Sequence, residues 1–225
     1  MKTVIFSQIS IDGKLTLGAG KSSRDLFSLL REEDRRFIHK FRGNVDAIMV
    51  GRKTIETDNP FLTNRYEEDK NPIRIVPTCS MNISPDSNIF IDGNRTIIVT
   101  SEQSVSAGKI EAIRKINKDC IICGKESVDF RRLFHMLEDN YSIHSIMAEG
   151  GGQLNWNLIR DGLVDEIILM QLPVIIGGAS NTTLVDGDGY TELSELKKYE
   201  LQEIQPRQGY TLLRYEKCIN LTVQQ

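Results

Sequence analysis

Short apolar runs rich in valine and isoleucine alternate along the chain with segments of helical periodicity. The runs predict strands at residues 4–9, 47–50, 73–76, 96–99, 119–124, 143–147, 166–172 and 211–215. Helical patterns occur at residues 32–41, 110–116, 130–137 and 154–159, and Asp129 is the expected cap of the third. This alternation favours an α/β fold with a mostly parallel central sheet and helices on both faces. Because no long helix separates the last two strands, we expect an antiparallel C-terminal edge.

Composition and charge narrow the class of protein. The 225 residues are 40% hydrophobic and 26% charged, as in an average soluble domain, so we expect one domain over residues 1–225 with a core at about 4–216. The net charge of −3 argues against a nucleic-acid partner. No apolar run has the length of a membrane span, and the first residues predict a strand rather than a signal peptide. We therefore expect a cytoplasmic protein that binds neither nucleic acid nor membrane.

The four cysteines raise the question of a metal or redox site. Cys120 and Cys123 have the spacing of half a zinc site. A second such pair is absent from the sequence, and none of the three histidines has metal-ligand spacing. On a strand, residues three apart point to opposite faces. We interpret all four cysteines as reduced thiols and predict no metal site.

A glycine-rich turn joins a predicted strand to a predicted helix at residues 149–156, Glu-Gly-Gly-Gly-Gln-Leu-Asn-Trp. Glycines let a backbone approach a ligand closely, and the following helix offers free N–H groups and a positive dipole end. These features suit a pyrophosphate. The turn lacks the Gly-x-Gly-x-x-Gly pattern and comes late in the chain, so a standard dinucleotide-binding fold is not supported. A tight structural turn is the alternative.

A second strand-to-helix turn reads Gly-Arg-Lys-Thr-Ile-Glu-Thr-Asp at residues 51–58. Arg52 and Lys53 supply cations and Thr54 supplies a hydroxyl, which suits a phosphate group. Alone, this stretch would be a solvated basic turn. Two such sites suit a ligand with two phosphate-bearing regions, such as a dinucleotide. The Asp-Gly sequences at 12–13 and 186–189 predict turns, the first of them beside a substrate pocket.

Several motifs occur together in a fixed order. They are Ser10-Ile11-Asp12-Gly13-Lys14; Arg42 followed by Gly51, Thr54, Asp58, Pro60, Leu62, Thr63 and Arg65; Asn71-Pro72-Ile73-Arg74-Ile75-Val76; Glu149-Gly150-Gly151-Gly152; and Leu163-Val164-Asp165-Glu166. With these motifs, residues 4–215 resemble the riboflavin-biosynthesis reductases that act on 2,5-diamino-6-ribosylamino-4(3H)-pyrimidinone 5′-phosphate. They resemble equally the C-terminal domain of bifunctional deaminase–reductases. Residues 51–57 also resemble a stretch of dihydrofolate reductase in which an Arg and a Thr contact NADPH phosphates.

The resemblance implies a dihydrofolate reductase-like fold, a homodimer, NADPH as cofactor and a phosphorylated pyrimidine as substrate. The implied cofactor-binding residues are Arg52, Thr54, Asp58, Thr100, Gly150, Gly151, Gly152, Gln153, Leu154 and Asn155. The implied substrate-binding residues are Ser22, Arg42, Leu62, Arg65 and Glu149. Arg52 would favour the 2′-phosphate and hence NADPH over NADH. Guanidinium groups suit the ribose 5′-phosphate, because they offer a planar fork to phosphate oxygens.

The implied reaction is hydride transfer to C1′ of the ribosylamine, which becomes a ribityl chain. Lys14 and Glu149 are the implied catalytic residues, because a positively charged imine nitrogen accepts hydride readily and its proton must be handled. A turn lysine and a helix-capping carboxylate are the structural alternatives for these two residues. The sequence lacks the deaminase pattern of His-x-Glu with Pro-Cys-x-x-Cys.

Two other functions stay open at this level. One is an NADPH reductase of the same fold that acts on another heterocycle, which the long segment 15–41 favours. The other is a non-catalytic nucleotide-binding protein, against which the joint presence of Lys14, Asp58, Arg65 and Glu149 argues.

Overall fold

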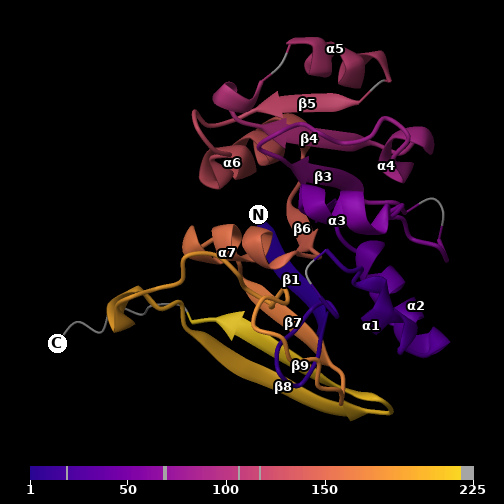
Figure 1. Ribbon diagram of the computed structural model, residues 1–225, viewed down its shortest axis with the longest axis vertical. Coiled ribbons are helices and arrows are strands. Elements are labelled where there is room, and N and C mark those ends of the chain that lie inside the picture. Colours follow the sequence, from indigo (N-terminus) through magenta and orange to yellow (C-terminus); the bar gives the residue numbers. More distant parts are fainter. Residues whose placement is uncertain (19, 68–69, 106, 117, 219–225) are drawn as a thin grey trace.

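One sheet runs through the length of the molecule, from β5 at the top of Figure 1 to β8 at the bottom. The computed structural model describes residues 1–18, 20–67, 70–105, 107–116 and 118–218. The strands are β1 Lys2–Ile9, β2 Ala47–Met49, β3 Ile73–Pro77, β4 Thr96–Thr100, β5 Asp119–Ile122, β6 Ser145–Ala148, β7 Glu166–Gln171, β8 Tyr199–Arg207 and β9 Tyr210–Lys217. Their order is β5-β4-β3-β2-β6-β1-β7-β9-β8. Neighbours from β5 to β7 are parallel, whereas β9 is antiparallel to both β7 and β8.

Helices lie on both faces of this sheet, as the sequence predicts. The α-helices are α1 Arg24–Ser28, α2 Glu32–Arg42, α3 Arg52–Asp58, α4 Asn88–Ile91, α5 Ala107–Lys115, α6 Phe130–Tyr141 and α7 Gly152–Arg160. Two 3₁₀ turns, η1 and η2, span Glu102–Ser104 and Leu193–Glu195. Because side chains alternate along a strand, Ile5 and Ile9 of β1 join the core layer under α6 and α7, whereas Val4 and Phe6 pack toward α1 and α2. A third cluster joins α3, α4 and α5 to β2, β3 and β4.

The cysteines and the predicted cap behave as the sequence indicates. Cys120 packs with the third cluster and Cys123 belongs to the core layer under α6 and α7, so the two thiols lie on opposite faces. All four cysteines are free. The Asp129 side chain accepts a hydrogen bond from the Arg132 amide at 3.0 Å at the start of α6.

Besides the 3₁₀ turn η1, one strand and two short helices were not predicted from the sequence. The antiparallel C-terminal edge is confirmed but is two strands wide, because β8 was not predicted. β8 is an exposed edge strand, so its sequence needs no continuous apolar face, and it contains Pro206. The short helices α1 and α4 have five and four residues, too few to show a helical period. Residues 172–198, between β7 and β8, contain η2 as their only helical turn or strand. This connection is longer than the one between α3 and β3, residues 59–72.

The sheet determines where the functional loops meet. β3, β2, β6 and β1 are consecutive parallel neighbours, so their carboxyl ends lie along one edge. Gly51, Glu149 and Ser10 each follow one of these strands within a few residues. In open parallel sheets ligands bind outside the carboxyl ends of the strands.

Candidate active site

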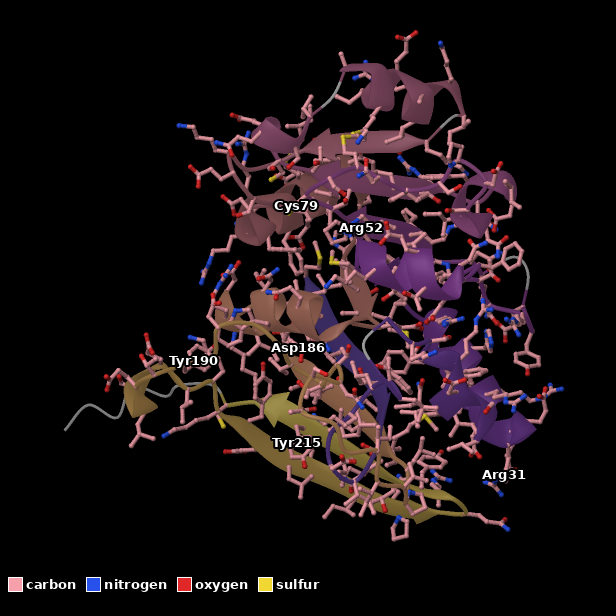
Figure 2. The ribbon with its side chains drawn as sticks, in the orientation of Figure 1. Arg31, Arg52, Cys79, Asp186, Tyr190 and Tyr215 are labelled. Carbon is pink, nitrogen blue, oxygen red and sulfur yellow. The ribbon has the colours of Figure 1, made fainter. Side chains whose placement is uncertain are left out.

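A cavity of about 910 Å³ opens along the carboxyl ends of β1, β2, β3 and β6. Its wall takes residues 6–8 from β1, the beginnings of α3 and α7, and parts of the segments 15–27, 60–65 and 77–80. Arg52, Cys79 and Asp186 all line it, and Figure 2 shows the first two above Asp186 in the same view. The cavity therefore gathers both glycine turns that the sequence singles out.

The glycine turn before α7 presents bare backbone to this cavity. A Cβ on Gly152 would lie 2.4 Å from Asp186 Oδ2 and 2.7 Å from the Thr183 carbonyl oxygen, so a larger residue requires these groups to move. The Asp186 amide donates to the Gly152 carbonyl at 3.1 Å. Asn155 Nδ2 donates to the Leu184 carbonyl at 2.8 Å. The loop around Asp186 is thus packed against the turn and fixes its shape.

Arg42 and Glu149 form a two-bonded ion pair in the cavity wall. Arg42 Nε donates to Glu149 Oε1 at 2.6 Å, and Nη2 donates to Oε2 at 2.7 Å. The side chains are only 14% and 16% exposed. Arg42 Nη1 also donates to the Thr63 carbonyl at 3.2 Å. Because a bidentate pair fixes both groups in one plane, α2 holds the carboxylate that ends β6 in a single orientation.

His39 lies one helical turn before Arg42 and also lines the cavity. The histidine is 2% exposed, its Nδ1 is 3.0 Å from the Thr63 carbonyl oxygen, and its ring meets Tyr66 edge-on. Burial and the positive charges of Arg42 and Arg65 lower the pKa of His39 to about 4. The imidazole is therefore neutral at physiological pH and adds no charge between the two arginines.

Arg65 lies in the wall near Arg42 and His39. It has no carboxylate partner among the residues that the structure describes. Its amide nitrogen lies 3.3 Å from His39 Nδ1, so the backbone that carries the guanidinium lies against the imidazole. Lys21 and Lys53 also line the cavity without a carboxylate partner in the described part of the chain. Unpaired cations at a concave wall suit an anionic ligand, and the planar guanidinium suits a phosphate best.

A fully buried arginine holds the loop that bears Leu62 and Arg65. Arg74 donates to both carboxylate oxygens of Asp92, at 2.9 and 2.5 Å, and to the Phe61 carbonyl at 2.9 Å. The next residue, Leu62, has φ of 55°, a left-handed conformation that a leucine rarely adopts. The arginine of the Asn-Pro-x-Arg motif thus supports the cavity wall from behind.

Asp58 ends α3 inside the cavity wall and has an unused hydrogen-bonding atom. Its Oδ2 accepts from the Ser23 hydroxyl at 2.7 Å, while its Oδ1 is buried without a partner in the described residues. Arg24 Nη2 donates to the neighbouring Asn59 carbonyl at 3.3 Å. A buried carboxylate oxygen without a donor is uncommon in proteins, and in a cavity wall it leaves room for a donor on a ligand.

Most of the residues that the resemblance implies line this cavity. They are Arg42, Arg52, Thr54, Asp58, Leu62, Arg65, Glu149, Gly151, Gly152, Gln153 and Leu154. Arg52 pairs with Glu56 one helical turn along α3, and both side chains remain partly exposed. Arg42 pairs with Glu149, so the two residues act as one unit rather than as separate ligands of phosphate and base.

Five implied residues lie outside the cavity wall, namely Lys14, Ser22, Thr100, Gly150 and Asn155. Lys14 forms a backbone bridge with Thr183, and its amide donates to the Ser10 hydroxyl at 2.9 Å. The Ser22 hydroxyl accepts from the Arg24 amide at 3.0 Å. Thr100 and Asn155 are fully buried, and the Gly150 carbonyl accepts from the Gly51 amide at 3.1 Å. Their roles toward ligands stay predictions.

The Asp-Gly turn after β1 has a structural role. Asp12 accepts hydrogen bonds from the Ser10 hydroxyl at 2.6 Å and from the amides of Ile176 and Gly177 at 3.0 and 2.7 Å. The Ser10 bond, followed by the two amide bonds, lowers the pKa of Asp12 to about 2. The turn thus ties the segment after β7 to the end of β1.

Sequence reasoning misses many residues of the wall, among them His39, Ser23 and Asp186. His39 precedes Arg42 by three positions on a helix, and this spacing places both on one face, a signal that was available. Asp186 does lie in a turn, but the turn packs against Gly152 instead of facing only solvent. No local pattern indicates the contact of Ser23 with Asp58, which joins segments far apart in the chain.

The described residues contain neither a helix suited to span a membrane nor a cluster of metal-ligand side chains. None of the helices there combines the length and apolarity that crossing a membrane requires. The described side chains also include no group of three or more histidine, cysteine or acidic residues placed to hold a metal ion.

Comparison with known proteins gives one family match and several similar proteins. The RibD C-terminal domain family matches residues 2–209. A 2,5-diamino-6-ribosylamino-4(3H)-pyrimidinone 5′-phosphate reductase of Aquifex aeolicus is 41% identical over 199 residues, which cover 88% of each chain. A reductase of the same name from Methanothermobacter thermautotrophicus is 32% identical over 93% of this chain and 92% of its own.

Solved structures share the fold at lower identity. RibD of Acinetobacter baumannii superposes with a TM-score of 0.79 at 16% identity, and the match covers 96% of this chain but only 58% of that one. The riboflavin biosynthesis reductase Rib7 of Saccharomyces cerevisiae has a TM-score of 0.71 at 20% identity, with 96% and 90% covered. These likenesses confirm the dihydrofolate reductase-like architecture that the motifs imply. Since the family match spans nearly the whole described chain, this protein belongs to the RibD C-terminal domain family.

Proposed function

We propose that this chain reduces 2,5-diamino-6-ribosylamino-4(3H)-pyrimidinone 5′-phosphate to its ribitylamino form with NADPH, in riboflavin biosynthesis. One observation carries the proposal: a single cavity joins a bare glycine turn to the Arg42–Glu149 pair and the unpaired Arg65. The turn suits a dinucleotide, and the Arg65 guanidinium suits the phosphate of a phosphorylated substrate. The names of the Aquifex and Methanothermobacter relatives support the same substrate.

The residues present fit a dinucleotide cofactor. The turn at Gly151 and Gly152 leaves no side chain between the start of α7 and the cavity, so pyrophosphate oxygens can approach the backbone N–H groups. Asp58 Oδ1 is a buried acceptor that lacks a donor, as a ribose hydroxyl or an amide would supply. When bound, the dihydronicotinamide supplies the hydride, and the chain contributes orientation and exclusion of water.

NADPH is preferred to NADH in this proposal because α3 places cations at the cavity. Arg52 and Lys53 both line it, and Lys53 has no carboxylate partner in the described residues. Arg52 forms an ion pair with Glu56, and because both side chains are partly exposed, breaking this pair costs little free energy. A 2′-phosphate can therefore take over the guanidinium.

The substrate end of the cavity has two tasks, to hold a phosphate and to face the positive charge of the imine. Arg65 is assigned the ribose 5′-phosphate, because its guanidinium is not engaged by a carboxylate of the described chain. Glu149 is assigned the nitrogen next to C1′, where a carboxylate stabilises the cationic imine that accepts hydride. Arg42 holds that carboxylate through two bonds.

Lys14 is assigned the role of proton donor to the nitrogen next to C1′. It lies outside the cavity wall, and its backbone is fixed by the bridge to Thr183. A lysine side chain is long and flexible, so donation requires a rotamer that reaches the cavity. A Lys14→Ala variant that turns over at the wild-type rate would remove this residue from the mechanism and leave Glu149 in place.

We also propose that the chain forms a homodimer through the β8 edge. Leu201 and Ile204 of this strand are 47% and 57% exposed. The register shift between Leu201 and Glu203 places Leu201 opposite Tyr215 and Ile204 opposite Leu213, so both apolar side chains lie on one face. An exposed edge with an apolar face supports pairing with a second copy.

The cofactor assignment is tested by titrating the protein with NADPH and, separately, with NADH. Trp156 is the only tryptophan and is buried in α7, the helix that the glycine turn begins, so its fluorescence reports binding. We expect saturable quenching with tighter binding of NADPH. Absence of binding by either nucleotide at millimolar concentration would contradict the reductase assignment. Reduction of a different heterocycle, detected from the product mass, would favour the alternative that the chain is a reductase of the same fold with another substrate.

A further inference from the structure

One buried hydroxyl in the cavity wall belongs to none of the residues assigned to the cofactor, the substrate or the reaction. Ser7 lies near the end of β1, is 5% exposed and lines the cavity. Its Oγ is buried and lacks a hydrogen-bond partner. Of the buried side-chain atoms without a partner in the described residues, only this hydroxyl and Asp58 Oδ1 belong to residues of the cavity wall. A buried hydroxyl without a partner is unfavourable in the free protein, and a ligand acceptor relieves the cost.

The alternation of β1 indicates which half of the cavity Ser7 serves. Ile5 and Ile9, two positions before and after it, belong to the core layer under α6 and α7. Ser7 therefore lies on the face of the sheet from which α7 and its glycine turn approach. Arg42 belongs to α2, which packs on the opposite face with Phe6, and it draws the Glu149 carboxylate to that side. The Ser7 hydroxyl thus belongs to the cofactor half.

We propose that the Ser7 hydroxyl donates a hydrogen bond to the carboxamide oxygen of the bound nicotinamide and so orients the ring for hydride transfer. The inference rests on the proposed function, because it takes the glycine turn as the pyrophosphate site. β1 is the parallel neighbour of β6, the strand that leads into the glycine turn, and Ser7 lines the same cavity as that turn. With pyrophosphate at the start of α7, Ser7 would be a buried donor within this half of the cavity for the nicotinamide end. Ser7 is a positioning and specificity-determining residue that the family motifs do not include.

The test compares cofactor analogues that differ only at the carboxamide. The thio analogue has a C=S group, a much weaker acceptor, whereas the 3-acetylpyridine analogue keeps the oxygen and lacks the NH₂ group. We expect Ser7→Ala to weaken binding of NADPH and of the reduced acetylpyridine analogue about three- to tenfold, the range of one neutral hydrogen bond. Binding of the reduced thio analogue should hardly change. The readout is the dissociation constant from Trp156 fluorescence, together with KM for each analogue.

Thr3 provides a matched control. It lies on the same strand and the same face, and its hydroxyl is likewise buried without a partner, but it does not line the cavity. Thr3→Val removes that hydroxyl at nearly constant volume and should leave all three cofactors unaffected. Ser7→Cys nearly keeps the side-chain volume but replaces the hydroxyl with a poor donor. If Ser7→Ala disturbs folding, Ser7→Cys should still show the same selective loss of affinity.

Three outcomes would overturn the inference. Equal loss of affinity for all three cofactors would mean that Ser7 acts through packing alone. A change confined to KM for the pyrimidine would place the hydroxyl at the substrate. Unchanged constants in both Ser7 variants would leave it without a ligand, while the proposed function would survive because the wild type still turns over. If the wild type binds no dinucleotide at all, the proposed function fails together with the inference.

Discussion

Single side chains in this cavity work through partners that lie far away in sequence. Arg42 and Glu149 are 107 positions apart, yet their two hydrogen bonds make them one rigid group. The motifs identify both residues as substrate ligands, but no local pattern shows that one holds the other. Long-range pairing of this kind follows from the sheet order, which brings the end of β6 next to α2, and sequence periodicity does not encode that order.

Breaking the pair should reduce turnover without removing the cofactor. We expect Glu149→Gln to lower kcat about 100-fold, because the amide cannot stabilise the positive charge on the reacting nitrogen. The dissociation constant for NADPH should stay within about twofold, since Asp58 and the glycine turn are untouched. Stopped-flow and steady-state kinetics separate the two effects.

The exposed pair Arg95–Asp119 offers a control for the loss of a charge interaction. Its side chains are 53% and 42% exposed. Asp119→Asn should change neither kcat nor stability by a measurable amount. Wild-type turnover in Glu149→Gln would remove Glu149 from the mechanism.

His39 makes the stability of the protein depend on pH. Its pKa is about 4 in the folded protein, below the ordinary 6.5, chiefly because the ring is buried and then because Arg42 and Arg65 are near. The unfolded chain therefore binds more protons between these values, and the free energy of unfolding should fall as the pH drops from about 6.5 to 4. The loss at pH 4 is on the order of 3 kcal/mol.

Urea unfolding of wild type and His39→Gln across this pH range measures the effect. The variant should be less stable at pH 7 yet show a flatter slope from pH 6.5 to 4. His144→Gln is the matched control, since that ring is largely exposed. Parallel slopes in wild type and His39→Gln would show that His39 is not the group responsible.

At the scale of elements, strands and helices with a clear apolar period were predictable, and short or exposed ones were not. Each predicted strand is present. Those of the parallel body were recognisable because buried parallel strands must be apolar on both faces. β8 was not predicted because an exposed edge strand needs no such pattern. The α1 helix escaped because it is one turn long, although its segment brings Ser23 to Asp58 in the cavity wall. Packing between elements, rather than local sequence, builds that part of the site.

The start of α7 depends on glycine at a single position. Gly152→Ala would place a Cβ 2.4 Å from Asp186 Oδ2, so the Asp186 loop must move away. We expect a loss of about 1–3 kcal/mol in the free energy of unfolding and weaker NADPH binding, because the same loop shapes the turn. Thermal denaturation and fluorescence titration measure the two quantities.

Gly108 supplies the comparison within a helix. It lies in α5, where an added Cβ meets nothing within 4 Å. Gly108→Ala should therefore be neutral or stabilising by about 0.5–1 kcal/mol. If Gly152→Ala behaves like Gly108→Ala, the turn is not constrained as described.

At the scale of the whole molecule, the sheet has two edges of different character. β5 forms one edge and β8 the other. The sequence allowed the parallel body and its antiparallel end to be predicted, but the width of that end, and hence the edge that a second copy would meet, required the structure. Strand order is set by contacts between distant segments, which no short window of sequence contains.

A charge on the β8 edge should therefore separate the proposed dimer. We expect Leu201→Lys and Ile204→Lys to shift the protein from dimer to monomer in sedimentation velocity, since a desolvated ammonium at an apolar interface is costly. Ile122→Lys introduces the same charge at the β5 edge, where the isoleucine is 40% exposed, and should leave the dimer intact. A wild type that sediments as a monomer would contradict the proposal.

The most direct test of the proposed activity is turnover with the phosphorylated pyrimidine itself. Purified protein is mixed with NADPH and 2,5-diamino-6-ribosylamino-4(3H)-pyrimidinone 5′-phosphate, the loss of dihydronicotinamide absorbance is followed, and the product is identified by mass spectrometry. We predict NADPH oxidation that depends on the pyrimidine, yields the ribitylamino product in equal amount and is abolished by Arg65→Ala at low substrate concentration. Saturable NADPH binding without any pyrimidine-dependent oxidation would contradict the account and identify the chain as a nucleotide-binding protein.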